Sequence, residues 1–173
     1  MIEKSEYYLS FQVGHQWYGV NVEDVIKVLH IVALTELPGV AKDVLGIMPL
    51  QEFVVPVVDL RIRFNLPNQS LRLDTPIIAL HTAQGPIGLI VDDVDDVEEI
   101  TETSNYGETE SPFVKSVARL PDKLLLMLDT SRLHTSETLP ESIAAVVEAT
   151  QPKPKKAAPK RKPRTKKAAA KTE

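Results

Sequence analysis

The sequence predicts an all-β protein made of two small lobes, on three observations. Residues 53–60, FVVPVVDL, are the most strand-like run, because four Val residues favour a pleated, buried surface. A weaker copy, LLLMLD at 124–129, ends on Asp129 as the first run ends on Asp59. The short strands between turn signals are typical of small barrels and sandwiches, so we expect lobes of roughly 65–70 residues each. Lobes of that size are marginal alone, so we expect them to share a core.

The two lobes are predicted to derive from one repeated unit. Tyr18–Val25, YGVNVEDV, aligns without gaps on Ile87–Val94, IGLIVDDV, at an offset of 69 residues. Asp59 and Asp129 are 70 residues apart. Two pairs of similar segments separated by nearly the same number of residues indicate an internal duplication. We expect each Asp to cap a turn through its side chain rather than to act in a catalytic carboxylate pair.

The first half of the chain is predicted to begin with a β-hairpin. Alternating aromatic and polar residues predict a strand at 7–13, with its partner at 17–21 after a turn. Residues 22–29 fit a short helical turn that runs into a strand, although periodicity does not settle this. Residues 40–47 are expected to hold a short helix that ends near Gly46.

The run at 53–60 is expected to be covered on both faces, since no charge interrupts it before Asp59. Pro56 removes one backbone donor, so this strand needs an edge, a bulge or an end at that point. After a surface loop at 66–70, apolar runs bounded by turn residues predict the remaining strands at 76–82, 87–91, 113–120 and 123–129, with a polar loop at 101–112.

Composition excludes several classes of protein and site. The chain has no Cys, which excludes disulfides and thiolate metal sites. At 43% hydrophobic and 5% aromatic residues, its core should be aliphatic. It holds no apolar run of about 18 residues and no secretory h-region, so we expect a cytoplasmic protein.

Charge divides the chain into an acidic body and a basic tail. Residues 1–150 carry ten Lys and Arg against 23 acids, a net charge of −13, whereas residues 151–173 carry ten against Glu173 alone, a net charge of +9. The Lys/Pro/Ala-rich tail cannot bury enough apolar surface to fold, so we expect it to be disordered.

Three interpretations of the tail stay open: it lies on the acidic body, binds nucleic acid without sequence preference, or binds an anionic membrane surface. Stacking on bases is not expected, because the tail has no aromatic residue. The basic residues available for these contacts are Lys153, Lys155, Lys156, Lys160, Arg161, Lys162, Arg164, Lys166, Lys167 and Lys171.

No motif indicates an enzyme, a cofactor or a metal site. The acidic run at 92–99, DDVDDVEE, lacks the Gly and Glu that an EF-hand loop requires, so it is predicted to be a solvated strand edge and turn. The four His residues have no metal-binding or catalytic spacing, and His81 is expected to be structural or exposed. The phosphate-binding loop and the nucleophile elbow are both absent. We therefore expect a binding protein without catalytic, cofactor-binding or metal-ligating residues.

Four segments together resemble the CheW-like chemotaxis coupling family: YGVNVEDV, GIMPLQEFVVPVVDLRIRFNL, IGLIVDDVDDV and FVKSVARLPDKLLLMLDTSRL. The resemblance implies two five-stranded SH3-like barrels packed together and no catalytic activity. It also implies an adaptor that couples the cytoplasmic tip of a methyl-accepting chemoreceptor to the regulatory domain of a CheA-type histidine kinase. We accordingly expect recruitment to membrane receptor arrays, and we keep nucleic-acid binding through the tail as the alternative function.

This chain departs from the family where the family binds partners. The usual N-L-R-G before the apolar strand is Pro49-Leu50-Gln51-Glu52 here, so Gln51 replaces the Arg that contacts the receptor. An acid common in the family is replaced by Lys27. These changes imply partners of altered charge. The residues that the resemblance assigns to partner binding are Lys27, Leu29, Pro49, Gln51, Glu52 and Val54. The groove between the lobes is expected to hold the receptor.

The domain boundaries follow from the resemblance and the charge division. We expect a CheW-like domain at 7–135, with lobes at roughly 7–70 and 71–135 and strand exchange allowed between them. Residues 136–150 are predicted to be a linker or a short helix, and 151–173 are the basic tail.

Overall fold

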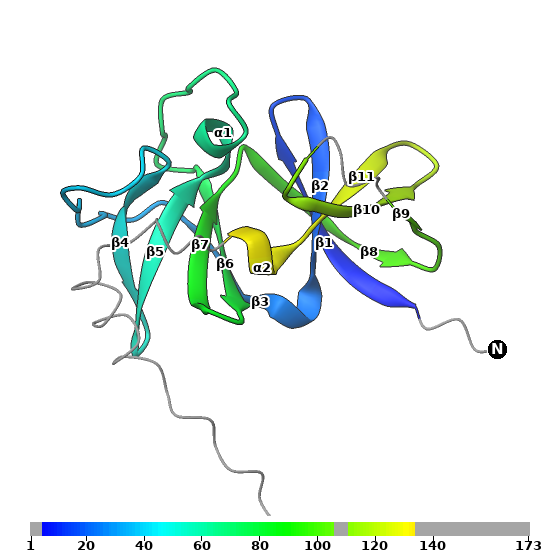
Figure 1. Cartoon of the computed structure of the whole chain (residues 1–173), viewed down its shortest axis with the longest axis horizontal. Coiled ribbons are helices and arrows are strands. Elements are labelled where there is room, and N and C mark those ends of the chain that lie inside the picture. Colours follow the sequence, from blue (N-terminus) through cyan, green and yellow to red (C-terminus); the bar gives the residue numbers. More distant parts are fainter. Residues whose placement is uncertain (1–4, 106–110, 134–173) are drawn as a thin grey trace, which may run out of the picture.

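The computed structural model describes residues 5–105 and 111–133, and within them the chain is mostly β-structure (Figure 1). The strands of this part are β1 (Glu6–Val13), β2 (Gln16–Asn21), β3 (Val25–His30), β4 (Val44–Leu50), β5 (Phe53–Asp59), β6 (Pro76–Thr82), β7 (Gly85–Ile90), β8 (Asp93–Ile100), β9 (Ser104–Asn105), β10 (Val114–Arg119) and β11 (Leu124–Leu128). Its helical turns are η1 (Val22–Asp24), α1 (Leu60–Arg63) and α2 (Thr130–Leu133).

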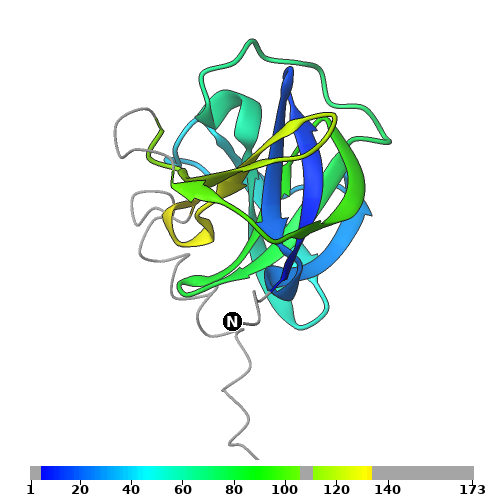
Figure 2. The same cartoon turned by 90° about the vertical axis from the view of Figure 1, so that its right-hand side faces the viewer.

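The strands form two sheets, one in each lobe. Lobe A has the strand order β8-β1-β2-β11-β10-β9, in which β9 has only two residues, and lobe B has the order β3-β6-β7-β5-β4. Figure 1 shows the lobes side by side, and Figure 2 places lobe A toward the viewer. The prediction of two small all-β lobes is confirmed.

The two lobes are not consecutive halves of the chain. Lobe A combines the β1–β2 hairpin with β8 to β11, and lobe B combines β3 to β5 with the β6–β7 hairpin. A boundary near residue 70 therefore does not separate the sheets, which corrects the lobes expected at 7–70 and 71–135. The exchange that this prediction allowed starts at η1, where Asn21 caps the turn by accepting a hydrogen bond from the Glu23 amide at 2.8 Å. The chain leaves lobe A at this turn and enters lobe B as β3.

The predicted repeat is visible in the strand pairing. β2 pairs with β11 in parallel, with Gly19 opposite Met127. β7 pairs with β5 in parallel, with Gly88 opposite Val57. Because the pairs match at the offsets found in the sequence, each lobe has the same central pair of strands, with one strand from each half of the chain.

The two strand-end aspartates cap turns, as predicted. The Oδ1 atom of Asp59 accepts a hydrogen bond from the Arg61 amide at 2.8 Å at the start of α1. The Oδ1 atom of Asp129 accepts one from the Ser131 amide at 3.1 Å at the start of α2. Both carboxylates therefore stabilise the turn that follows their strand.

The lobes share a hydrophobic core, which confirms the expectation drawn from their size. One cluster lies in the barrel of lobe B, and a smaller one lies in the barrel of lobe A. The largest cluster spans the boundary, where Phe11 and Val20 of lobe A join Ile78, Leu80 and Leu89 of lobe B. All five are fully buried. Burial of this kind stabilises by about 25 cal/mol per Å² of apolar surface, so neither lobe keeps its full stability without the other.

β5 is covered on both faces, as predicted. Val57 belongs to the core of lobe B, and Val58 belongs to the shared core. The ladder with β7 includes only residues 57–59 of β5. Pro56 therefore precedes the paired part of the strand on that side, where its missing N–H breaks no ladder bond.

The helix predicted at 40–47 is wrong, and the secondary structure of 22–29, which the sequence left undecided, is now clear. Residues 40–47 form a turn and the start of β4 rather than a helix. Gly46 has φ +151°, and a Cβ there would lie 2.5 Å from the Thr35 carbonyl oxygen, so the glycine permits close approach of two segments instead of ending a helix. Residues 22–29 form η1 followed by β3. The predicted linker at 136–150 and the tail lie outside the described residues.

Candidate partner-binding surface

Four of the predicted partner-binding residues lie together at the β4–β5 hairpin. Gln51 and Glu52 form its two-residue turn and are exposed. Pro49 lies opposite Val54 across the two strands. Gln51 has φ 56°, a left-handed conformation that costs a residue with a Cβ roughly 1–2 kcal/mol. The hairpin tip therefore presents an amide and a carboxylate to solvent, beside an exposed proline.

The other two predicted residues lie on β3, away from that hairpin. Lys27 is exposed, whereas Leu29 is half-buried and packs against the core of lobe B. β3 and β4 are opposite edges of the lobe B sheet, with β6, β7 and β5 between them. The structure therefore divides the six residues into two sets on one lobe, and it assigns Leu29 mainly to the core.

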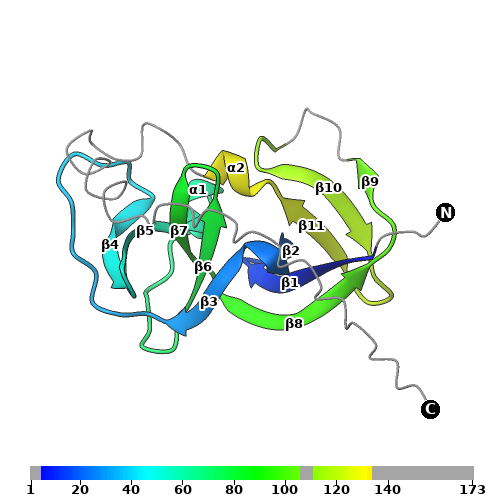
Figure 3. The ribbon, with the colours of Figure 1, turned by 90° about the horizontal axis from the view of Figure 1, so that it is seen from below.

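A second surface, whose residues were not predicted, is a groove at η1, the turn where the chain passes from lobe A to lobe B. It has a volume of about 220 Å³ and is lined by Tyr7 of β1, Val22 of η1 and Val97 of β8. These residues are 52%, 36% and 46% exposed, unusual values for large apolar side chains that lie together. Glu6 and Glu23 also line this groove, which we call the lobe-boundary groove. Figure 3 shows β1 and β8, the strands that contribute Tyr7 and Val97, side by side.

The sequence carried only a weak signal of this groove. Val97 stands between acids in the run at 92–99, where an apolar residue is unexpected on a solvated edge. Tyr7 is far from Val97 in sequence, and only the pairing of β1 with β8, with Leu9 opposite Val97, brings them together. A single sequence does not specify that pairing.

The acidic run forms the edge strand β8, which agrees with its predicted place at a strand edge. On one face of β8, the Lys123 Nζ lies 2.7 Å from Asp95 and 2.8 Å from Glu98. The same nitrogen lies 4.5 Å from the centre of the Trp17 ring. Burial alone would lower the pKa of Lys123, but these carboxylates outweigh it and raise the pKa above its ordinary value. The lysine therefore stays charged and ties β8 to the β10–β11 turn.

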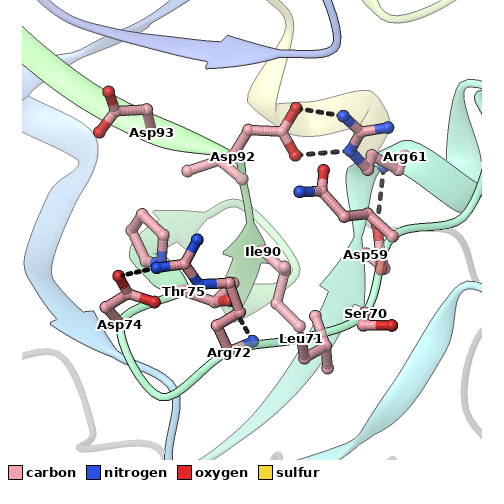
Figure 4. A pocket seen from close by; sticks show the side chains of 13 residues that line it. Asp59, Arg61, Ser70, Leu71, Arg72, Asp74, Thr75, Ile90, Asp92 and Asp93 are labelled. Carbon is pink, nitrogen blue, oxygen red and sulfur yellow. Dashed lines mark hydrogen bonds and ion pairs between the residues drawn. The ribbon is translucent and has the colours of Figure 1, made fainter.

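A charged cleft of about 170 Å³ lies beside α1 (Figure 4). Arg61 holds Asp92 through two bonds, from Nε to Oδ1 at 2.6 Å and from Nη2 to Oδ2 at 2.8 Å. The Gly14 amide donates to the same carboxylate at 2.6 Å. Because Gly14 belongs to lobe A and Arg61 follows β5 of lobe B, Asp92 joins the two lobes at the point where the chain passes from β7 to β8. We interpret this cleft as part of the interlobe connection.

Asp59 lines the same cleft and is only 2% exposed. Burial raises the pKa of Asp59 above its ordinary value, and hydrogen bonds from the Arg61 and Ile62 amides partly oppose the shift. The carboxylate is thus a buried cap whose charge is costly.

The described residues contain no group of three or more His, Asp or Glu side chains placed to hold a metal ion. In this part of the chain, no helix is long and apolar enough to cross a bilayer.

His81 is exposed, as predicted, and its ring contacts Phe53 edge to face at 6.2 Å. The ten basic residues of the tail lie outside the described residues, so contacts with nucleic acid or membrane remain predictions.

Comparison with known proteins places this fold in a family. Residues 7–138 match the CheW-like domain. The chemotaxis protein CheW of Klebsiella aerogenes is 25% identical over 138 residues, which are 76% of this chain and 83% of that protein. CheW of Bacillus subtilis is 27% identical over 143 residues, which are 79% of this chain and 92% of that protein.

A solved structure agrees with the sequence comparisons. The crystal structure of the scaffolding protein TtCheW from Thermoanaerobacter tengcongensis aligns with a TM-score of 0.72 and 26% identity. The alignment covers 78% of this chain and 97% of the TtCheW chain. The two-barrel fold expected from the resemblance is thereby confirmed. This chain belongs to the CheW-like family.

Proposed function

We propose that this chain is a non-enzymatic adaptor that couples a chemoreceptor to a CheA-type histidine kinase. The observation that carries the proposal is the lobe-boundary groove, within a fold whose relatives are chemotaxis proteins. Its three exposed apolar side chains line one groove, and exposed apolar side chains gathered at one place favour partner binding there. A groove with apolar side chains suits the apolar face of a partner helix, and we assign it to the receptor.

Lobe B supplies the second surface that an adaptor needs. The β4–β5 hairpin tip, with Gln51 and Glu52, lies on a different part of the molecule from the groove. Since the groove is assigned to the receptor, we assign this tip to the kinase regulatory domain. The resemblance instead implies a receptor contact at Gln51. The test below therefore measures the binding of both partners to each variant. Glu52 adds an anion at the tip, which favours a partner with a basic contact there.

The shared core allows both partners to act on one body. The two surfaces are joined through the buried interlobe cluster and the Arg61–Asp92 pair, so displacement of one lobe is resisted by the other. A partner shifts the kinase equilibrium only by the difference between its affinities for the two kinase states. We therefore expect the adaptor to act by holding kinase and receptor in a fixed geometry rather than by chemistry of its own.

The test measures binding of a purified receptor tip fragment and a kinase regulatory domain separately. Val97→Lys places a charge in the groove and is expected to weaken receptor binding at least tenfold, about 1.4 kcal/mol, while kinase binding is kept. Glu52→Lys is expected to weaken kinase binding and to keep receptor binding. Leu73→Lys and Glu36→Lys are the matched controls, since both residues are exposed and lie outside the two surfaces. Binding of neither partner by the unmodified chain would refute the proposal.

A further inference from the structure

The lobe-boundary groove has an acidic rim that no described basic side chain neutralises. Glu23 lines the groove, and Glu99 lies opposite Tyr7 in the pairing of β1 with β8. Neither glutamate forms an ion pair with another residue of the described ranges, 5–105 and 111–133. Tyr7 is 52% exposed, so about half of its surface is open to a partner. The groove thus combines apolar contact surface with uncompensated negative charge.

The other face of β8 already shows how this strand holds a lysine. Lys123 contacts Asp95 and Glu98 and lies over the ring of Trp17. Its side chain is only 7% exposed. The methylene stem of a lysine packs on apolar surface while its ammonium group meets carboxylates and an aromatic face. The groove offers the same set of partners, with Tyr7 as the ring and Val22 and Val97 as the apolar surface.

The chain carries a matching cationic segment close at hand. Residues 151–173 have a net charge of +9, and Pro and Ala separate their basic residues. The 17 residues 134–150 separate α2 from this segment. Seventeen residues span at most about 60 Å, whereas a domain of this size has a radius of gyration of about 14 Å. The segment can therefore reach the groove, where its effective concentration would be of millimolar order.

We propose that residues 151–173 dock in the lobe-boundary groove of their own chain and compete there with the receptor. The docking itself follows from the charge complementarity and the apolar groove. The competition rests on the proposed function, since it requires that the receptor binds this groove. Docking makes the adaptor autoinhibited, and high salt or loss of the tail charge releases the groove.

The first test uses a spin label on the full chain. The chain has no cysteine, so Ala169→Cys takes a single label. At low salt the label should broaden the amide NMR signals of Tyr7, Val22 and Val97. The effect should fade as salt shortens electrostatic range from about 10 Å at 0.1 M to about 3 Å at 1 M. Glu23→Gln with Glu99→Gln should reduce the broadening at least twofold, whereas Glu36→Gln with Asp122→Asn, two exposed acids elsewhere, should not.

Several outcomes would overturn the docking. Broadening that is absent, spread evenly over the body, or unchanged by the groove variant would contradict it. If the label shows no contact with the body but the tail binds duplex DNA or anionic phosphatidylserine vesicles, the segment serves one of those partners instead.

The second test separates docking from competition. If the tail occupies the groove in about nine molecules of ten, replacing its ten basic residues with Gln should strengthen receptor binding about tenfold. Broadening without any receptor binding by the tail-neutralised chain would refute the proposed function and leave the docking intact. Receptor binding of equal affinity with and without the tail charge would refute the competition.

Discussion

Replacing Asp92 with Ala is expected to lower the free energy of unfolding by about 2–3 kcal/mol. The change removes both carboxylate bonds to Arg61, at 2.6 and 2.8 Å, and leaves the Gly14 amide without its acceptor at 2.6 Å. The two charged side chains are 18% and 22% exposed, so solvent screens their attraction only in part. Since these contacts join the lobes, their loss should weaken the whole molecule and not one turn alone.

The chain offers a matched pair for comparison. Arg72 and Asp74 form the same kind of ion pair at 2.9 Å, but their side chains are 72% and 64% exposed. An exposed pair contributes little, so Asp74→Ala should cost less than about 0.5 kcal/mol. Both ion pairs join an arginine to an aspartate, so the comparison isolates the effect of burying the pair.

A double-mutant cycle at each pair gives the coupling energy directly. Urea unfolding is followed by circular dichroism and by the fluorescence of Trp17, the one tryptophan of the chain. The cycle should give about 1–2 kcal/mol for Arg61 with Asp92 and below about 0.5 kcal/mol for Arg72 with Asp74. Equal coupling energies, or a neutral Asp92→Ala variant, would refute the argument that burial makes this pair an interlobe connection.

Three further predictions concern single residues. Asp59→Asn keeps the capping oxygen without the buried charge, so its stability at pH 7 should equal or exceed that of the native chain, whereas Asp59→Ala should lose about 1 kcal/mol in urea unfolding. Because the folded state raises the pKa of Asp59, it binds more protons than the unfolded chain between the ordinary and the raised pKa. Native stability should therefore fall as pH rises through that window, and a pH series of melting curves should show a smaller decline in the Asn variant. Gln51→Gly should stabilise by about 0.5–1 kcal/mol because φ is 56°, and the same change at Glu52, which lacks a positive φ, should give no gain in chemical denaturation. Lys123→Met should cost about 1–2 kcal/mol in thermal unfolding because two carboxylates lose their cation, whereas Lys115→Met, at an exposed site, should cost less than half as much.

The sequence predicted the elements better than their partners. Branched apolar residues and turn signals located most of the strands, and the spacing of Asp59 and Asp129 indicated the repeat. The exchange of hairpins between lobes was not specified, because a strand's pattern gives its buried face and not the strand beside it. The short helix expected near Gly46 failed for a related reason, since that glycine serves a contact with Thr35 that local pattern does not show.

The candidate site was predicted in part. The resemblance directed attention to the β4–β5 hairpin, and the structure places Gln51 and Glu52 on an exposed turn, although their role in partner binding stays a prediction. The residues of the lobe-boundary groove were missed because Val97 lies far along the chain from Tyr7 and Val22. Only the fold brings these residues together, so the one signal in the sequence, Val97 between acids, did not reveal the groove.

The central claim is that one chain holds receptor and kinase through two separate surfaces. The most direct measurement is retention of the kinase regulatory domain on immobilised receptor tip, with and without this chain, for the native protein and for Val97→Lys and Glu52→Lys. The native chain is expected to retain the kinase domain, and each variant should fail by losing a different partner. Retention that does not depend on the chain, or variants that lose both partners alike, would contradict the claim.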